Sequence, residues 1–76
     1  MKEMYLIQLK AKQTAIVKEI VGGYGVIHRL EALGIRPGKK ITKISAHFWR
    51  GPVTVIVDKT KIAIGHGMAQ KIVVEV

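Results

Sequence analysis

Residues 21–40 read VGGYGVIHRLEALGIRPGKK, and this stretch decides how the rest of the chain is organised. Three glycines fall within residues 22–25, a composition that suits neither a strand interior nor a helix interior. Val26, Leu30 and Leu33 then recur at the spacing of one helix face. The pattern predicts a short helix over about residues 25–33 with these three side chains buried.

The predicted helix has a clear end. Gly34 stands where a left-handed residue closes a helix, and we expect Ile35 to fold back on the last turn as in a Schellman motif. Pro37 and Gly38 then favour a tight turn and prevent the helix from continuing. A helix this short is not stable alone in water, so its apolar face must pack on the rest of the chain.

The sequence before and after this helix reads as short strands. Leu6–Leu9 is a brief apolar segment, either an edge strand or a cover over one end of a barrel. In residues 14–21 both alternate rows are partly apolar, which predicts a strand covered on both faces for some of its length. Residues 39–46 break strict alternation, and a β-bulge near Thr42 and Lys43 would reconcile the spacing.

The last third of the chain predicts a hairpin and a closing strand. Residues 53–57 and 62–64 are apolar runs joined at Asp58–Thr60, a turn without glycine in which we expect a strained backbone. A single helical turn is expected near residues 67–71. The chain then closes with residues 72–76, whose side chains predicted to face the core are Ile72, Val74 and Val76.

These elements define the expected fold class, which is mostly β. Five to six short strands with one short helix make a small SH3-like barrel, because closing the sheet removes exposed edges. An OB-fold is the alternative, but its helix usually comes later in the chain than it does here. The length of 76 residues predicts a single domain over residues 1–76.

Composition limits the classes of partner and compartment. The net charge is +8, from thirteen Lys and Arg against five Asp and Glu, which favours an anionic partner. The basic residues are spread along the chain, so they also fit solvated loop ends and outward strand positions. The absence of cysteine excludes disulfides and fits a reducing compartment. We read no signal peptide and no apolar run long enough to span a membrane.

Catalytic chemistry is not indicated. No two carboxylates have a spacing suited to acid–base work, and the glycine-rich segment lacks the lysine of a phosphate-binding loop, so we expect no enzyme and no cofactor. The same glycines could offer backbone N–H groups to an anion at the helix start, or form a plain turn. The three histidines (His28, His47 and His66) have no local metal-binding spacing, so we assign no metal ligands and expect surface histidines.

The best candidate contact surface is the turn that holds Phe48, Trp49 and Arg50, because Trp and Arg are enriched at interface hot spots. The two aromatic rings could instead fold over the end of the barrel. On the helix, Arg29 flanks the apolar face, where it could pack over that face or contact a partner. Ile27 falls off the other side of that face and is predicted to be a spare apolar group for a partner.

Several motifs together resemble the FeoA family. They are R-L-x-x-L-G-I-x-P-G over residues 29–38, G-P-V-x-V over residues 51–55, I-A-I over residues 62–64 and A-x-x-I-x-V over residues 69–74. The resemblance runs from about Leu6 to Val76. His66–Gly67 and Asp58–Thr60 depart from the family pattern locally.

The resemblance implies an SH3-like barrel and a cytoplasmic accessory role in ferrous iron uptake. Family members are thought to act with a membrane permease that has a cytosolic GTP-binding domain, so the chain could lie at the inner membrane through that partner. The expected partner-binding residues are Ile27, Arg29, Phe48, Trp49 and Arg50. The same barrel resembles a domain of metal-dependent repressors of the diphtheria-toxin-repressor type, although this chain has no helix-turn-helix.

Alternatives stay open beside this leading hypothesis. A basic barrel with Tyr24, Phe48 and Trp49 could stack on nucleic acid, but charge and three aromatic residues are its only support. Direct sensing of a transition metal through the three histidines is a weaker alternative. Self-association is also compatible with the sequence.

Overall fold

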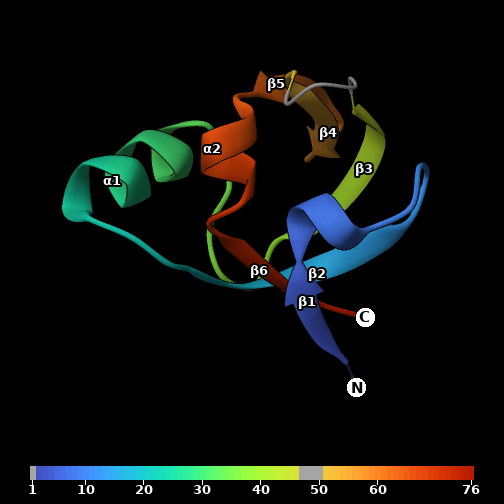
Figure 1. Ribbon diagram of the computed structural model, residues 1–76, viewed down its shortest axis with the longest axis horizontal. Coiled ribbons are helices and arrows are strands. Elements are labelled where there is room, and N and C mark those ends of the chain that lie inside the picture. Colours follow the sequence, from blue (N-terminus) through green and yellow to red (C-terminus); the bar gives the residue numbers. More distant parts are fainter. Residues whose placement is uncertain (1, 47–50) are drawn as a thin grey trace.

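The structure is a computed structural model that describes residues 2–46 and 51–76 (Figure 1). Its elements are β1 (Glu3–Tyr5), the 3-10 helix η1 (Leu6–Gln8), β2 (Thr14–Ile20), α1 (Tyr24–Ala32), β3 (Lys40–Ala46), β4 (Val53–Val57), β5 (Thr60–Ile64), α2 (His66–Ala69) and β6 (Ile72–Glu75). The predicted mostly β class is confirmed, with one helix and one short helical turn close to their expected positions.

All strand pairs are antiparallel, and the strands form one bent sheet in the order β1-β6-β2-β3-β4-β5. We expected closure of the barrel to remove exposed edges. Within the described residues the hydrogen-bonded ladder does not close, because β1 and β5 each have only one neighbour. The sheet is therefore an open barrel with two edges.

Two short helical segments fill the opening of this barrel. The 3-10 helix η1 contacts α2, and both insert a fully buried side chain, Leu6 and Ala69. The apolar segment near the N-terminus therefore covers one end of the barrel, while β1 just before it forms an edge strand. Lys2 and Val76 exchange backbone hydrogen bonds of 3.1 and 2.9 Å, which hold the two termini together (Figure 1).

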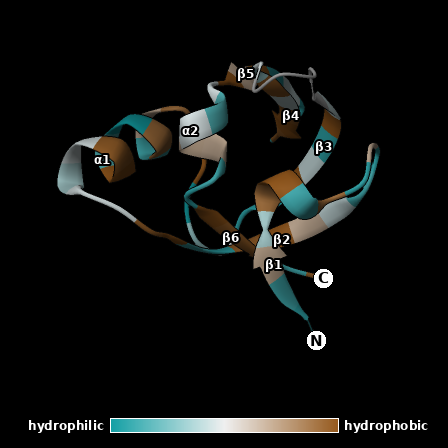
Figure 2. Ribbon diagram, viewed as in Figure 1, coloured by the Kyte–Doolittle hydropathy of each residue, from teal (hydrophilic) through white to brown (hydrophobic). Residues whose placement is uncertain are grey.

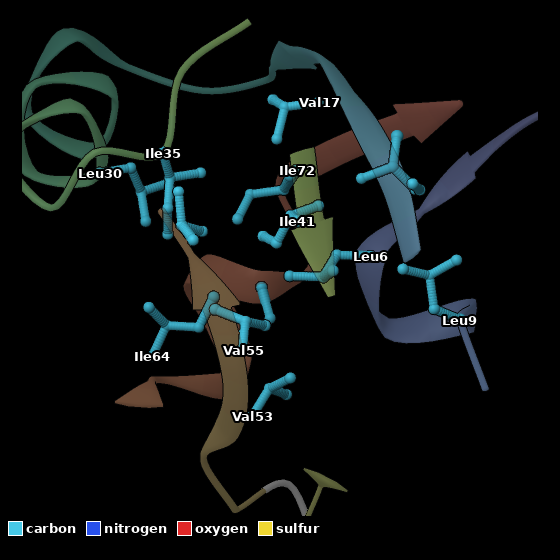
Figure 3. Packing of buried hydrophobic residues seen from close by; sticks show 14 of the residues in the cluster. Leu6, Leu9, Val17, Leu30, Ile35, Ile41, Val53, Val55, Ile64 and Ile72 are labelled. Atoms are coloured by element: carbon cyan, nitrogen blue, oxygen red, sulfur yellow. The ribbon is translucent and has the colours of Figure 1, made fainter. Parts of the chain in front are cut away.

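The core comes from alternate residues of the strands. In β4 the side chains of Val53, Val55 and Val57 are buried, as the alternation predicted; Figure 3 shows Val53 and Val55. Apolar and polar residues accordingly alternate along the strands in Figure 2. Val76 was predicted to face the core, and this is wrong: it is 39% exposed, because it lies past the end of β6 where no element covers it.

A bulge in β2 explains another difference from the prediction. We expected both faces of this strand to be covered, yet Ile16 is 41% exposed. The pairing of β2 with β6 shifts between Val17 and Glu19. This shift exchanges the two rows, so that Val17 and Ile20 both point into the core although they are three residues apart.

The bulge predicted in β3 is present, one residue later than expected. The pairing of β3 with β4 shifts between Lys43 and Ser45, which leaves Ile44 as the extra residue. Lys43 lies two residues after Ile41 and before the shift, so it continues the inward row by ordinary alternation, and Ile44 does not. The expected bulge had placed Ile44 on the row of Ile41, and this is wrong.

The buried Lys43 ties η1 to the sheet. Its residue is only 8% exposed, and its ammonium Nζ donates hydrogen bonds to the carbonyl oxygens of Ile7, at 2.9 Å, and Leu9, at 2.7 Å. These carbonyls lie in and just after η1, at its C-terminal end, where a cation is favoured. Burial lowers the pKa of Lys43 from its usual value of 10.5, because the charged form is harder to desolvate.

The end of α1 confirms the predicted Schellman motif. Gly34 has φ +91°, its N–H bonds to the carbonyl of Glu31 at 2.9 Å, and the N–H of Ile35 bonds to the carbonyl of Leu30 at 3.0 Å. Leu30 and Ile35 are both fully buried (Figure 3). Leu33 was expected on the buried face, and this is wrong, since it is 42% exposed. The buried side of α1 is formed by Val26, Ile27 and Leu30, and Leu33 lies at the margin of this arc.

The hairpin between β4 and β5 has the two-residue turn Asp58–Lys59. Both residues have positive φ, 51° and 66°, as a type I′ turn requires. The expected backbone strain therefore falls on two residues. The carboxylate Oδ2 of Asp58 accepts a hydrogen bond from Lys39 Nζ at 2.8 Å, which holds the turn beside the start of β3.

The glycine at the end of α1 gives a first prediction. Replacing Gly34 with alanine should lower the free energy of unfolding by about 1 kcal/mol, because the left-handed backbone is strained for a residue with a Cβ. Gly25→Ala is a matched control inside α1, where a Cβ meets nothing within 4 Å. It should raise stability by about 0.5–1 kcal/mol through helix propensity. Urea denaturation measures the unfolding free energy of both variants. Equal changes in the two variants would contradict the assignment of Gly34 as the left-handed residue that closes α1.

The lysine under η1 gives a second prediction. Lys43→Met should cost about 1–3 kcal/mol of unfolding free energy, because two carbonyls lose their donor. Between the lowered pKa of Lys43 and 10.5 the unfolded chain binds more protons than the folded chain. The stability of the natural chain relative to Lys43→Met should therefore rise with pH in that window. Urea denaturation across alkaline pH tests this, with Lys10→Met at an exposed position as the neutral control.

Candidate partner-binding surface

Helix α1 stands at one side of the sheet and presents one face to the core (Figure 1). Leu30 is fully buried, and Val26 and Ile27 are half-buried and pack against the core cluster. These three positions form one arc of the helix. The remaining arc is free of contact with the core and makes up the candidate surface, which consists of Tyr24, His28, Arg29, Ala32 and Leu33.

Tyr24 is the most prominent side chain of this surface, because it is 76% exposed. It stacks on His28 one helical turn later, with ring centroids 4.7 Å apart and planes tilted by 46°. The phenol oxygen of Tyr24 and Nε2 of His28 lie within a hydrogen bond of 2.9 Å. The pair fixes two aromatic rings in one orientation, so that a partner would bind them with little loss of side-chain freedom.

The charge of this surface is positive. Arg29 is exposed, and within the described residues it forms no ion pair. Arg36 lies just beyond the helix and donates from Nη2 at 3.1 Å to the carbonyl of Glu31, which also accepts the N–H of Gly34 at the helix end. An aromatic pair beside a free arginine is the residue set that dominates binding energy at protein interfaces.

The structure places some of the predicted contact residues and not others. Arg29 is exposed, and its contact with a partner stays a prediction. Ile27 is half-buried against the core, so it is only partly available to a partner. Phe48, Trp49 and Arg50 lie outside the described residues, and their role stays a prediction.

Two side chains of the candidate surface, Leu33 and Tyr24, were not predicted to contact a partner protein. Leu33 was assigned to the buried face because the i, i+4, i+7 spacing was taken as the core stripe, whereas the buried arc begins at Val26 and Ile27 and ends at Leu30. Tyr24 was weighed only as a stacking group for nucleic acid. The signal for it was present: a large ring flanked by glycines at a helix start has little around it to bury it.

The histidines do not form a common site in the part of the chain that the structure describes. His28 is bound to Tyr24 on α1, and Nε2 of His66 on α2 lies 3.3 Å from the amide nitrogen of Gln70. His47 lies outside the described residues. Among the residues described, no three His, Cys, Asp or Glu side chains gather closely enough to hold a metal ion.

The FeoA domain family matches residues 4–76. The chain belongs to the FeoA family. Over 66 residues it is 41% identical to "Putative Fe(2+) transport protein A" of Methanocaldococcus jannaschii. The aligned residues cover 87% of this chain and 78% of that protein. The predicted resemblance is confirmed.

Solved structures confirm the expected SH3-like fold. The crystal structure of an iron uptake regulatory protein (FeoA) superposes with a TM-score of 0.90 at 28% identity and covers 97% of both chains. A manganese-dependent transcriptional repressor superposes with a TM-score of 0.88 over 96% of this chain but only 41% of its own. At 19% identity this second similarity concerns the fold alone. In the described residues of the present FeoA family chain, no helix is long and apolar enough to cross a membrane.

The two leucines of α1 test which face of the helix is free. Leu30→Ala should cost about 2–5 kcal/mol of unfolding free energy, because it leaves a cavity in the core. Leu33→Ala should change that energy by about 0.5 kcal/mol or less. Urea denaturation measures the unfolding free energy of both variants. Because both substitutions replace leucine with alanine, a difference between them reports the difference in burial. A large cost at Leu33 would show that the candidate surface is packed in solution.

Proposed function

We propose that this FeoA family protein is a non-enzymatic accessory protein of ferrous iron transport. In this role it binds the cytosolic GTP-binding domain of an iron permease, and the exposed face of α1 makes the contact. Family membership over residues 4–76 is the observation that carries the proposed role in iron transport. The name of the archaeal relative, a Fe(2+) transport protein, supports the same role.

The form of the α1 surface supports binding to another protein. Tyr24 and Leu33 are exposed apolar groups, and Arg29 lies between their positions around the helix. Such a surface offers area for desolvation together with a charged donor. The helix below it is fixed by the buried Leu30 and Ile35, so the surface is preorganised, and binding does not have to order it.

Three of the five carboxylates of the chain form ion pairs with lysines. Lys18 Nζ lies between Glu3, at 3.3 Å, and Glu75, at 3.7 Å, and these two carboxylates raise the pKa of Lys18. Asp58 is bonded to Lys39. These contacts join strands or hold a turn, and they support a role in binding and not in group transfer.

The charge of the chain supports an acidic surface on the partner. A protein of net charge +8 attracts such a surface over long range, which raises the association rate more than the final affinity. The proposal therefore predicts that added salt slows association with the permease domain and changes dissociation less.

A pair of substitutions tests the proposed contact. Arg29→Ala should weaken binding to the isolated GTP-binding domain of the cognate permease by about tenfold, the effect of a moderate hot spot. Lys10→Ala removes one positive charge from an exposed site away from α1 and should leave dissociation unchanged. Surface plasmon resonance measures both rates. Binding that is equally strong in both variants contradicts the role of α1, and no binding by the natural chain contradicts the proposed function.

A further inference from the structure

The two edges of the open sheet differ in how they are protected. The β1 edge is only three residues long, and the N–H of Tyr5 is already bonded to Oε1 of Gln8 at 2.7 Å. The β5 edge is five residues long and has neither a proline nor a bulge, since Thr60–Ile64 pairs with β4 at every position without a shift. Natural sheets usually protect such an edge against strand addition.

The hairpin geometry shows which backbone groups of β5 face outward. A two-residue turn begins with a hydrogen-bonded pair, here Val57 and Thr60, and such pairs alternate along the ladder. Thr60, Ile62 and Ile64 therefore bond to β4. Lys61 and Ala63 direct their N–H and C=O groups away from the sheet. Within the described residues no other backbone group bonds to them.

Lysines outnumber carboxylates around this edge, where Asp58 of the turn is paired with Lys39. Lys59 and Lys61 are exposed on the turn and on β5. The start of β3, with Lys39 and Lys40, lies beside the same turn, because Lys39 bonds to Asp58. By contrast, three of the five carboxylates of the chain, Glu3, Glu19 and Glu75, lie on β1, β2 and β6 at the other half of the sheet.

We propose that the free edge of β5 binds an extended acidic segment of a partner protein by strand addition. The backbone of that segment bonds to Lys61 and Ala63, as in other cases of β-augmentation. Its side chains alternate: those beside Lys61 on the outer face are carboxylates, and those beside the half-buried Ile62 on the inner face are apolar. A second copy of this chain is disfavoured here, because it would bring Lys59 and Lys61 of two cationic chains together.

This edge is distinct from the α1 surface, and the inference does not depend on the proposed role in iron transport. The probe is a fluorescein-labelled peptide of alternating glutamate and valine, matched in length to β5. Fluorescence anisotropy at low salt measures its binding to the natural chain. We expect saturable binding that weakens as salt is added.

Ala63→Pro removes an outward N–H without touching the bonds to β4, since proline is tolerated on a free edge. It should weaken peptide binding by about tenfold or more. Ala11→Pro is the matched control. Ala11 lies in the turn in which Gln13 N–H bonds to Lys10 and Lys12 has φ 70°, a geometry that accepts proline at the Ala11 position. This control should bind like the natural chain.

Lys61→Glu keeps the proposal testable if Ala63→Pro fails to fold. It should weaken binding of the glutamate–valine peptide and allow binding of a lysine–valine peptide of the same length. No binding of the acidic peptide by the natural chain, or equal binding by Ala63→Pro, overturns the proposal. Sedimentation that shows a dimer of the natural chain and a monomer of Ala63→Pro also overturns it, because the edge then pairs with a second copy.

Discussion

The structure depends on one backbone constraint, the left-handed residue Gly34 that closes α1. Because Gly34 has φ +91°, the chain reverses in one residue, and the N–H of Ile35 reaches the carbonyl of Leu30 at 3.0 Å. Leu30 and Ile35 then enter the core as neighbours, both fully buried. A nine-residue helix that would not persist alone is in this way anchored to the sheet at its C-terminal end. Its outer face, with Tyr24 and Arg29, is presented on a fixed support.

The second organising feature is that the sheet stays open. An open barrel must fill its gap, and here η1 and α2 do so with Leu6 and Ala69, while Lys43 binds the carbonyls at the end of η1. Two sheet edges remain without a neighbouring strand. Of these only the β1 edge is short and has an N–H that is already hydrogen-bonded, that of Tyr5. The open β5 edge and the free face of α1 are thus two separate surfaces of one small domain. They differ in chemistry: one offers backbone hydrogen bonds among lysines, the other aromatic and apolar side chains with an arginine.

Much of the fold could be predicted from the sequence, at the positions where a local rule determines the structure. Gly34 and Pro37 end the helix by backbone geometry alone, and the alternation of Val53, Val55 and Val57 reports a strand with one buried face. The predictions are wrong where a neighbouring helix or strand determines which way a side chain points. The bulge after Val17 and the bulge after Lys43 follow from pairing registers with β6 and β4, which one strand's pattern does not contain. Leu33 was misplaced because the helix is rotated so that Ile27, with Val26 and Leu30, packs against the core.

Native-state hydrogen exchange of the Ile35 amide is the most direct measurement of the central claim, since this amide exists as a protected group only while α1 is anchored. The account predicts that Ile35 exchanges as slowly as the amides of β6, through unfolding of the whole domain. Exchange at Ile35 that is as fast as at the exposed turn around Ala11 would show that α1 detaches from a folded barrel, and it would contradict the account.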